Sequence, residues 1–159
     1  MSFSELGQIS VLGWNHVITP VQTFLMFLET TKKPHSNGEH QQILYDLGIH
    51  IGKGIASLIE TERQVKGKEL FDEVLKYTTV TGWGRHLLIE GDIDKGKLKI
   101  KGISTIAITI EHSDQPVCSF ITGCLTGITE IATKKQWKGK ETKCKAKGDP
   151  YCEFELELK

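Results

Sequence analysis

The sequence lacks several features that would place it in a broad functional class. Its 20 basic and 20 acidic residues cancel, so no overall charge points to nucleic acid or to an anionic membrane surface. No stretch approaches the roughly 20 apolar residues of a transmembrane helix, and the N-terminus shows no secretory signal. We therefore expect a cytoplasmic protein without nucleic-acid or membrane partners, in which stable disulfides are uncommon.

Motifs of common catalytic sites are also missing. The sequence has no GxxxxGK[ST] phosphate-binding loop, no GxGxxG turn after a strand, no GxSxG elbow and no HExxH helix. It therefore shows neither a cofactor fingerprint nor a candidate catalytic residue. An enzyme is not the favoured interpretation.

The composition is that of an ordinary folded domain. Apolar residues make up 38% of the 159 residues and charged residues 25%. Neither a repeat of 20 to 50 residues nor a low-complexity linker is present. We expect a single domain over residues 1–159, which is long enough to bury its own core.

Helices are expected in the first half of the chain. Thr19 and Pro20 form a helix-start signal ahead of an apolar stripe. Apolar residues then repeat at spacings of three and four over residues 39–62, which predicts a long amphipathic helix. A third helix fits the sequence KELFDEVLKY, residues 68–77.

Glycines inside the predicted helices indicate close packing. Gly48, Gly52 and Gly54 each weaken the long helix, so we expect another helix to pack against it. Gly123 and Gly127 stand four residues apart in a later helical segment and give it a flat face, which suits packing on a sheet.

Beyond residue 82 the apolar period changes to two, which is typical of strands. A helix is expected after Pro116, and a hairpin turning at residues 148–150 closes the chain. The pattern predicts an α+β fold, with N-terminal helices followed by an antiparallel sheet, a packed helix and a C-terminal β-hairpin. The first three strands are expected at residues 85–94, 97–103 and 104–112.

The four cysteines allow three interpretations: buried core residues, a disulfide or a metal site. Alternation in the last strand turns Cys152 toward the core, and the preceding turn can fold Cys144 back beside it. Cys118 lies at the expected start of a helix, which favours a thiolate. Three converging thiolates would suit zinc, whereas buried free cysteines are equally common. Cys124 faces another side of that helix and is assigned to the core.

The residues alone leave the fourth metal ligand open. Glu141 is close in sequence, but positions 141 and 144 point to opposite faces of a regular strand. Both could bind one ion only if the strand bulges or begins between them. His112, six residues before Cys118, is the alternative.

Three stretches together resemble the 4-vinyl reductase domain family. They are PVCSFITGCLTGITEI, KETKCKAKGDPYCEFEL and the strand entry GWGRH, and the similarity is best over residues 82–158. The resemblance implies a ligand-binding α+β fold, related to subunits of the transport-protein-particle tethering complex and to phenol-sensor domains.

The resemblance also implies a metal site. The phenol sensors hold a structural zinc with three cysteines and a glutamate, which fall here on Cys118, Cys144, Cys152 and Glu141. A zinc with four protein ligands has no open position and is structural. The residues that hold phenol in those sensors have no good equivalents here, so phenol is not the expected ligand.

We therefore expect a zinc-stabilised domain that binds or senses a hydrophobic, aromatic or hydrocarbon molecule. Alternatives are a homodimerising protein-interaction subunit without a small ligand, and an accessory protein in tetrapyrrole vinyl reduction. The pocket is expected between the central helices and the sheet. Its candidate walls are Phe71, Tyr77, Trp83 and Phe120.

Overall fold

The computed structural model describes residues 2–3, 9–11, 14–17, 19–32, 36–110 and 112–159. It confirms the predicted α+β class. The helices are α1 (Val21–Thr30), α2 (Asn37–Arg63), α3 (Gly67–Val80), α4 (Thr105–Thr109), α5 (Ser119–Thr133) and the 3-10 turn η1 (Lys145–Lys147). The strands are β1 (Ser2–Phe3), β2 (Ile9–Val11), β3 (Trp14–His16), β4 (Gly84–Asp92), β5 (Lys97–Ser104), β6 (Trp137–Lys143) and β7 (Cys152–Leu158).

Within the described residues the main sheet has four antiparallel strands in the order β4-β5-β7-β6. Its inner face is apolar because alternate residues of β5 and β7 point inward. Its outer face carries lysines of β5 opposite glutamates of β7, such as Lys99 opposite Glu155. Buried inner residues include Leu98, Ile100, Phe154 and Leu156.

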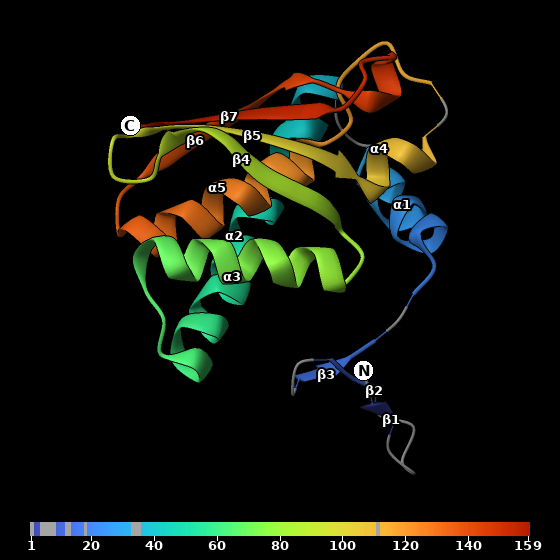
Figure 1. Cartoon of the computed structure of the whole chain (residues 1–159). Helices are drawn as coiled ribbons and strands as arrows, with labels where there is room; N and C mark the ends of the chain where they lie inside the picture. The colour runs from blue at the N-terminus through green and yellow to red at the C-terminus, as the bar shows by residue number, and fades with distance from the viewer. Residues whose placement is uncertain (1, 4–8, 12–13, 18, 33–35, 111) are drawn as a thin grey trace.

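The helices cover the inner face of the sheet in layers (Figure 1). Helix α5 packs on β6, α3 packs on β4, and α2 lies against α5. The expected helix–helix packing is found at Gly48 and Gly52, whereas Gly54 faces open space. The expectation that Gly123 and Gly127 pack on the sheet is wrong. They meet the backbone of α2, since two glycine faces let the helix axes approach more closely than a sheet would.

The segment expected as a third strand, residues 104–112, is instead largely helix α4. Strand β5 pairs with β4 as far as Ser104 and with β7 as far as Gly102, where β7 begins. Further extended residues would have no neighbouring strand to bond their backbone groups. The helical turn bonds them internally, with the Ile110 N–H donating to the Ile106 carbonyl at 3.2 Å. Tertiary pairing therefore overrides the β-branched composition.

The small sheet β1-β2-β3 lies apart from the main sheet (Figure 1). It contacts the body through α3, where His16 Nε2 and the Tyr77 hydroxyl are 2.8 Å apart and Trp14 packs edge-on against the Tyr77 ring. In the part of the chain that the structure describes, no helix combines the length and apolar character needed to cross a bilayer.

Candidate metal centre and ligand groove

Three cysteines and one glutamate from separate elements converge below one end of the main sheet. Cys118 precedes α5, Glu141 lies on β6, Cys144 follows β6, and Cys152 opens β7. One ligand atom from each lies within 4.8 Å of every other. The three cysteine side chains are fully buried. These four residues are hereafter the Cys3Glu cluster.

A local irregularity brings Glu141 and Cys144 to the same side of the hairpin. Glu141 pairs with Phe154, but Lys143 pairs with Glu153, so the register shifts between them. Cys144 then lies outside β6, at the start of η1. The parity of a regular strand therefore does not hold here. His112 is largely exposed, with Nε2 3.5 Å from Asp114 Oδ1, and is not part of the cluster.

The geometry of the cluster fits a metal ion. The Sγ atoms of Cys118 and Cys152 are 3.9 Å apart. That is close to the edge of about 3.8 Å expected for a tetrahedron with metal–sulfur bonds of about 2.3 Å. Glu141 Oε2 accepts the Cys118 N–H at 2.9 Å, while its buried Oε1 has no protein partner. Because buried polar atoms are normally bonded, Oε1 is available as a ligand atom.

Electrostatics point the same way. Burial raises the pKa of Glu141 to about 8. Hydrogen bonds from Cys118 and Cys144 lower the pKa of Cys152, and the Lys145 N–H also donates to its sulfur at 3.4 Å. The pKa of Cys118 is raised, chiefly because its thiol bonds to the neighbouring cysteines. The site thus favours one thiolate, and a bound divalent cation would allow all four groups to be anionic.

Backbone contacts hold the hairpin around the cluster. Asp149 Oδ2 accepts the Cys144 N–H at 2.8 Å, which closes the turn before β7. The Ser113 N–H donates to the Ala146 carbonyl at 2.9 Å and ties the segment before α5 to η1. Sequence reasoning missed both residues. The GDP turn, to which Asp149 belongs, was the available signal.

The four residues expected to wall a pocket are dispersed. Phe71 and Phe120 are buried core residues, and Tyr77 contacts the N-terminal sheet. Trp83 lines a small interior cavity between the helices and the sheet. That cavity measures about 20 Å³, which is room for about one water molecule.

His86 also lines this interior cavity, and it was not anticipated. Its side chain is 3% exposed, and neither ring nitrogen has a partner among the described residues. Burial lowers its pKa to about 4. The ring lies over Gly102, where a Cβ atom would be 2.5 Å from the His86 Cδ2. Strand alternation in GRHLL was the available signal, since it places His86 on the inner face.

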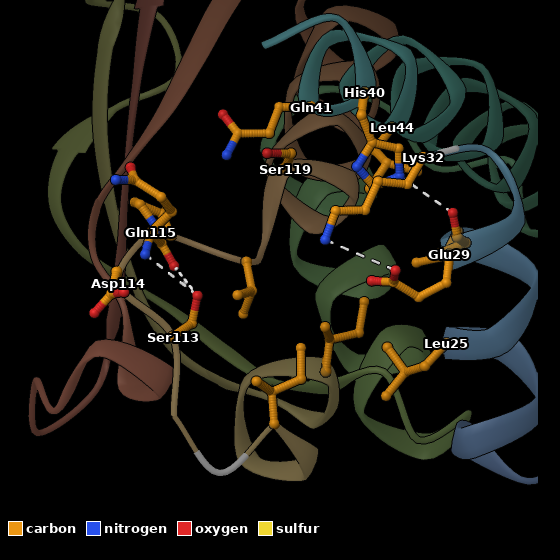
Figure 2. Close-up of a pocket in the computed structure, with 15 residues that line it drawn as sticks. Leu25, Glu29, Lys32, His40, Gln41, Leu44, Ser113, Asp114, Gln115 and Ser119 are labelled. Carbon is orange, nitrogen blue, oxygen red and sulfur yellow. Dashed lines mark hydrogen bonds and ion pairs between the residues drawn. The ribbon is translucent and has the colours of Figure 1, made fainter. Parts of the chain in front are cut away.

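A larger groove lies between α1, α2, α4 and the segment before α5 (Figure 2). Its volume is about 530 Å³. Lys32 and Glu29 lie at its rim with Nζ and Oε2 3.8 Å apart, and His40 Nε2 lies 3.1 Å from the Leu28 carbonyl oxygen. The apolar part of its lining comes from Leu25, Leu28, Leu44, Ile106, Ile110, Pro116 and Val117.

Comparison with known proteins relates this architecture to one family. Residues 104–158 match the family model of the 4-vinyl reductase domain. An uncharacterized protein of Methanocaldococcus jannaschii is 29% identical over 58% of this chain, and the match spans 61% of that relative.

Solved structures share the fold over most of the chain. The phenol-responsive sensory domain of the transcription activator PoxR, solved with phenol, has a TM-score of 0.82 at 17% identity and covers 99% of this chain and 84% of its own. A vinyl-4-reductase family protein of Methanocaldococcus jannaschii has a TM-score of 0.62 at 20% identity, covering 91% and 84%.

A trafficking protein particle complex subunit 3 from Naegleria fowleri, solved covalently bound to palmitic acid, has a TM-score of 0.65 at 14% identity. It covers 87% of this chain and 92% of its own. The resemblance noted from the sequence is thus confirmed, and residues 104–158 form a 4-vinyl reductase domain.

Proposed function

We propose that this chain is a zinc-stabilised domain that binds a small hydrophobic molecule in the groove of Figure 2. The groove itself carries the proposal. Its volume of about 530 Å³ lies within the range of known ligand pockets, and its floor is aliphatic with a few polar groups at the rim. A molecule with an apolar body and one polar end would match this distribution.

Zinc is the metal that we propose for the Cys3Glu cluster. Thiolates favour soft or borderline ions, and a set of four buried protein ligands is typical of a closed structural zinc site. When bound, the ion would supply positive charge without an open position for chemistry. The chain's own residues supply the rest, because the cluster joins the start of α5 to the hairpin of β6 and β7.

The similar proteins support a ligand-binding role. One structural neighbour is described as a phenol-responsive sensory domain and another as covalently bound to palmitic acid. Both ligands named there are hydrophobic. We also infer that residues 1–159 act as one domain in the cytoplasm, where the four free cysteines would stay reduced.

The metal is tested by elemental analysis of the purified, reduced chain. We expect about one zinc per chain in the wild type and none in Cys152→Ser. Cys124→Ser is the matched control, since Cys124 is buried but lies outside the cluster. A wild-type protein free of metal would overturn this part of the proposal.

The groove is tested with 1-heptanol followed by methyl NMR. We expect shifts at Leu25, Leu44 and Ile110, which line the groove, and several-fold weaker binding by Leu25→Asn. Leu87→Asn is the control, because Leu87 is about half exposed on β4 and does not line the groove. Equal binding by both variants would move the ligand elsewhere.

A homodimeric interaction subunit is the second candidate. Met26 and Phe27 on α1 are 71% and 57% exposed, which is unusual for adjacent large apolar residues. Sedimentation of the wild type and Phe27→Asp tests it. A dimer that the substitution dissociates supports this function, and a monomeric wild type contradicts it.

A further inference from the structure

The metal cluster and the groove share one piece of chain. Residues 104–110 and 112–118, hereafter the clasp, run from the end of β5 to the start of α5. The clasp supplies nearly half of the groove lining: Ile106 and Ile110 from α4, then Ser113 to Val117. Figure 2 shows Ser113, Asp114 and Gln115 on the side of the groove opposite α1.

Both ends of the clasp are attached to the cluster. At one end, the Ser104 backbone forms a hydrogen bond to the Cys152 sulfur. At the other end, Cys118 is itself a member of the cluster, and its N–H donates to Glu141 at 2.9 Å. No other segment described in the structure both lines the groove and joins the cluster at two points.

The middle of the clasp also contacts the metal hairpin. Helix α4 packs on η1, and the Ser113 N–H donates to the carbonyl of Ala146, which is 2% exposed. The opposite side of the groove comes from α1 and α2, which lie outside the cluster. One side of the groove therefore depends on the cluster and the other does not.

We propose that the clasp couples the two sites, so that metal bound at the Cys3Glu cluster raises the affinity of the groove for its ligand. This inference rests on the proposed function. Four anionic ligand groups repel one another without a cation, which loosens both ends of the clasp and hence one side of the groove. Coupling between two binding sites is reciprocal, so the groove ligand must tighten metal binding by the same factor.

The test measures 1-heptanol affinity on the full chain by methyl NMR, with zinc and after chelation under reducing conditions. We expect zinc to tighten binding at least about five-fold. Zinc affinity, measured by competition with a chelator, should improve by the same factor when heptanol saturates the groove. Equal heptanol affinity in both states overturns the coupling while leaving the groove intact. Absence of zinc binding or of groove binding overturns the proposed function as well.

An insertion separates the clasp from its anchors. Two glycines between Asp114 and Gln115, in an exposed part of the clasp, should preserve zinc affinity and lower heptanol affinity at least about five-fold. The same insertion between Asp94 and Lys95, in the exposed turn joining β4 and β5, should change neither. This comparison uses only zinc-loaded protein, so it decides the question even if the zinc-free chain unfolds. Equal heptanol affinities in the two insertion variants would contradict the proposal.

Discussion

Helix α5 is held in two different ways along its length. Its middle lies directly on the backbone of α2, through glycines on both helices. Its first turn follows Cys118, where polar ligand atoms crowd together in the Cys3Glu cluster. The first contact is complete with protein atoms alone, whereas the second leaves Glu141 Oε1 buried without a protein partner.

The difference shows which part of the fold needs no metal. A Cβ atom at Gly123 would lie 2.0 Å from the Tyr45 carbonyl oxygen, so the helices meet without intervening side chains. Dispersion and apolar burial stabilise such an interface independently of any ion. The cluster instead concentrates acidic groups that require positive charge. We therefore expect the helical layers to be stable alone and the clasp to depend on metal.

The largest expected effect comes from filling the helix interface. Gly123→Val should cost about 5 kcal/mol or more, because backbone atoms of α2 occupy the space of the new side chain. Urea unfolding or circular dichroism measures the loss, which is comparable to the whole stability of many domains. A folded variant of near wild-type stability would show that the helices separate easily.

Removal of zinc should have the next largest effect. A ligand at about 1,000 times its dissociation constant stabilises the native state by about 4 kcal/mol, and chelation removes that contribution. The melting temperature should fall, and hydrogen exchange should rise in the clasp more than in α2 and α5. Cys152→Ser should show no response to the chelator. A wild-type melting temperature that ignores chelation would place the cluster outside the fold's metal chemistry.

Acidification should act through His86. Its folded pKa of about 4 lies below the ordinary 6.5, so between these values the unfolded chain binds a proton that the folded chain does not. Stability from this group is present above pH 6.5 and lost as the pH falls to 4, by about 3 kcal/mol. His86→Phe should remove this part of the pH profile in urea titrations, whereas substitution of the exposed His50 by Gln should retain it. Identical profiles for all three proteins would exclude His86 as the source.

The smallest effect should be a gain. Gly54 lies on α2 close to Gly52, but no atom lies within 4 Å of the place that a Cβ atom would take. Gly54→Ala should stabilise the protein by about 0.5 to 1 kcal/mol, because alanine favours the helix. Thermal unfolding measures it. A loss of stability would indicate an unrecognised contact at this face.

Local patterns carried much of the fold. Apolar spacing over residues 39–62 predicted α2, which spans Asn37–Arg63, and alternation predicted β4, β5 and β7. The same reasoning failed at residues 104–112, where β-branched residues form α4 because no neighbouring strand continues. It also failed at Gly123, since a glycine face does not state whether its partner is a helix or a sheet.

The candidate site divides in the same way. Residue chemistry and the family resemblance together selected Cys118, Glu141, Cys144 and Cys152, and these side chains do converge. The 530 Å³ groove could not be found in the sequence, because its sides come from helices far apart along the chain. The unpartnered nitrogens of His86 were hidden for the same reason, since no local pattern reveals which partners a buried side chain lacks.

The sequence by itself determined the α+β class, the main helices and the cysteines able to share an ion, because periodicity and side-chain chemistry are local properties. Tertiary structure alone decided the register shift that admits Glu141, the pairing of α2 with α5, and the clasp joining cluster to groove. Those features depend on which distant backbone groups and surfaces meet, and that is settled only when the whole chain packs.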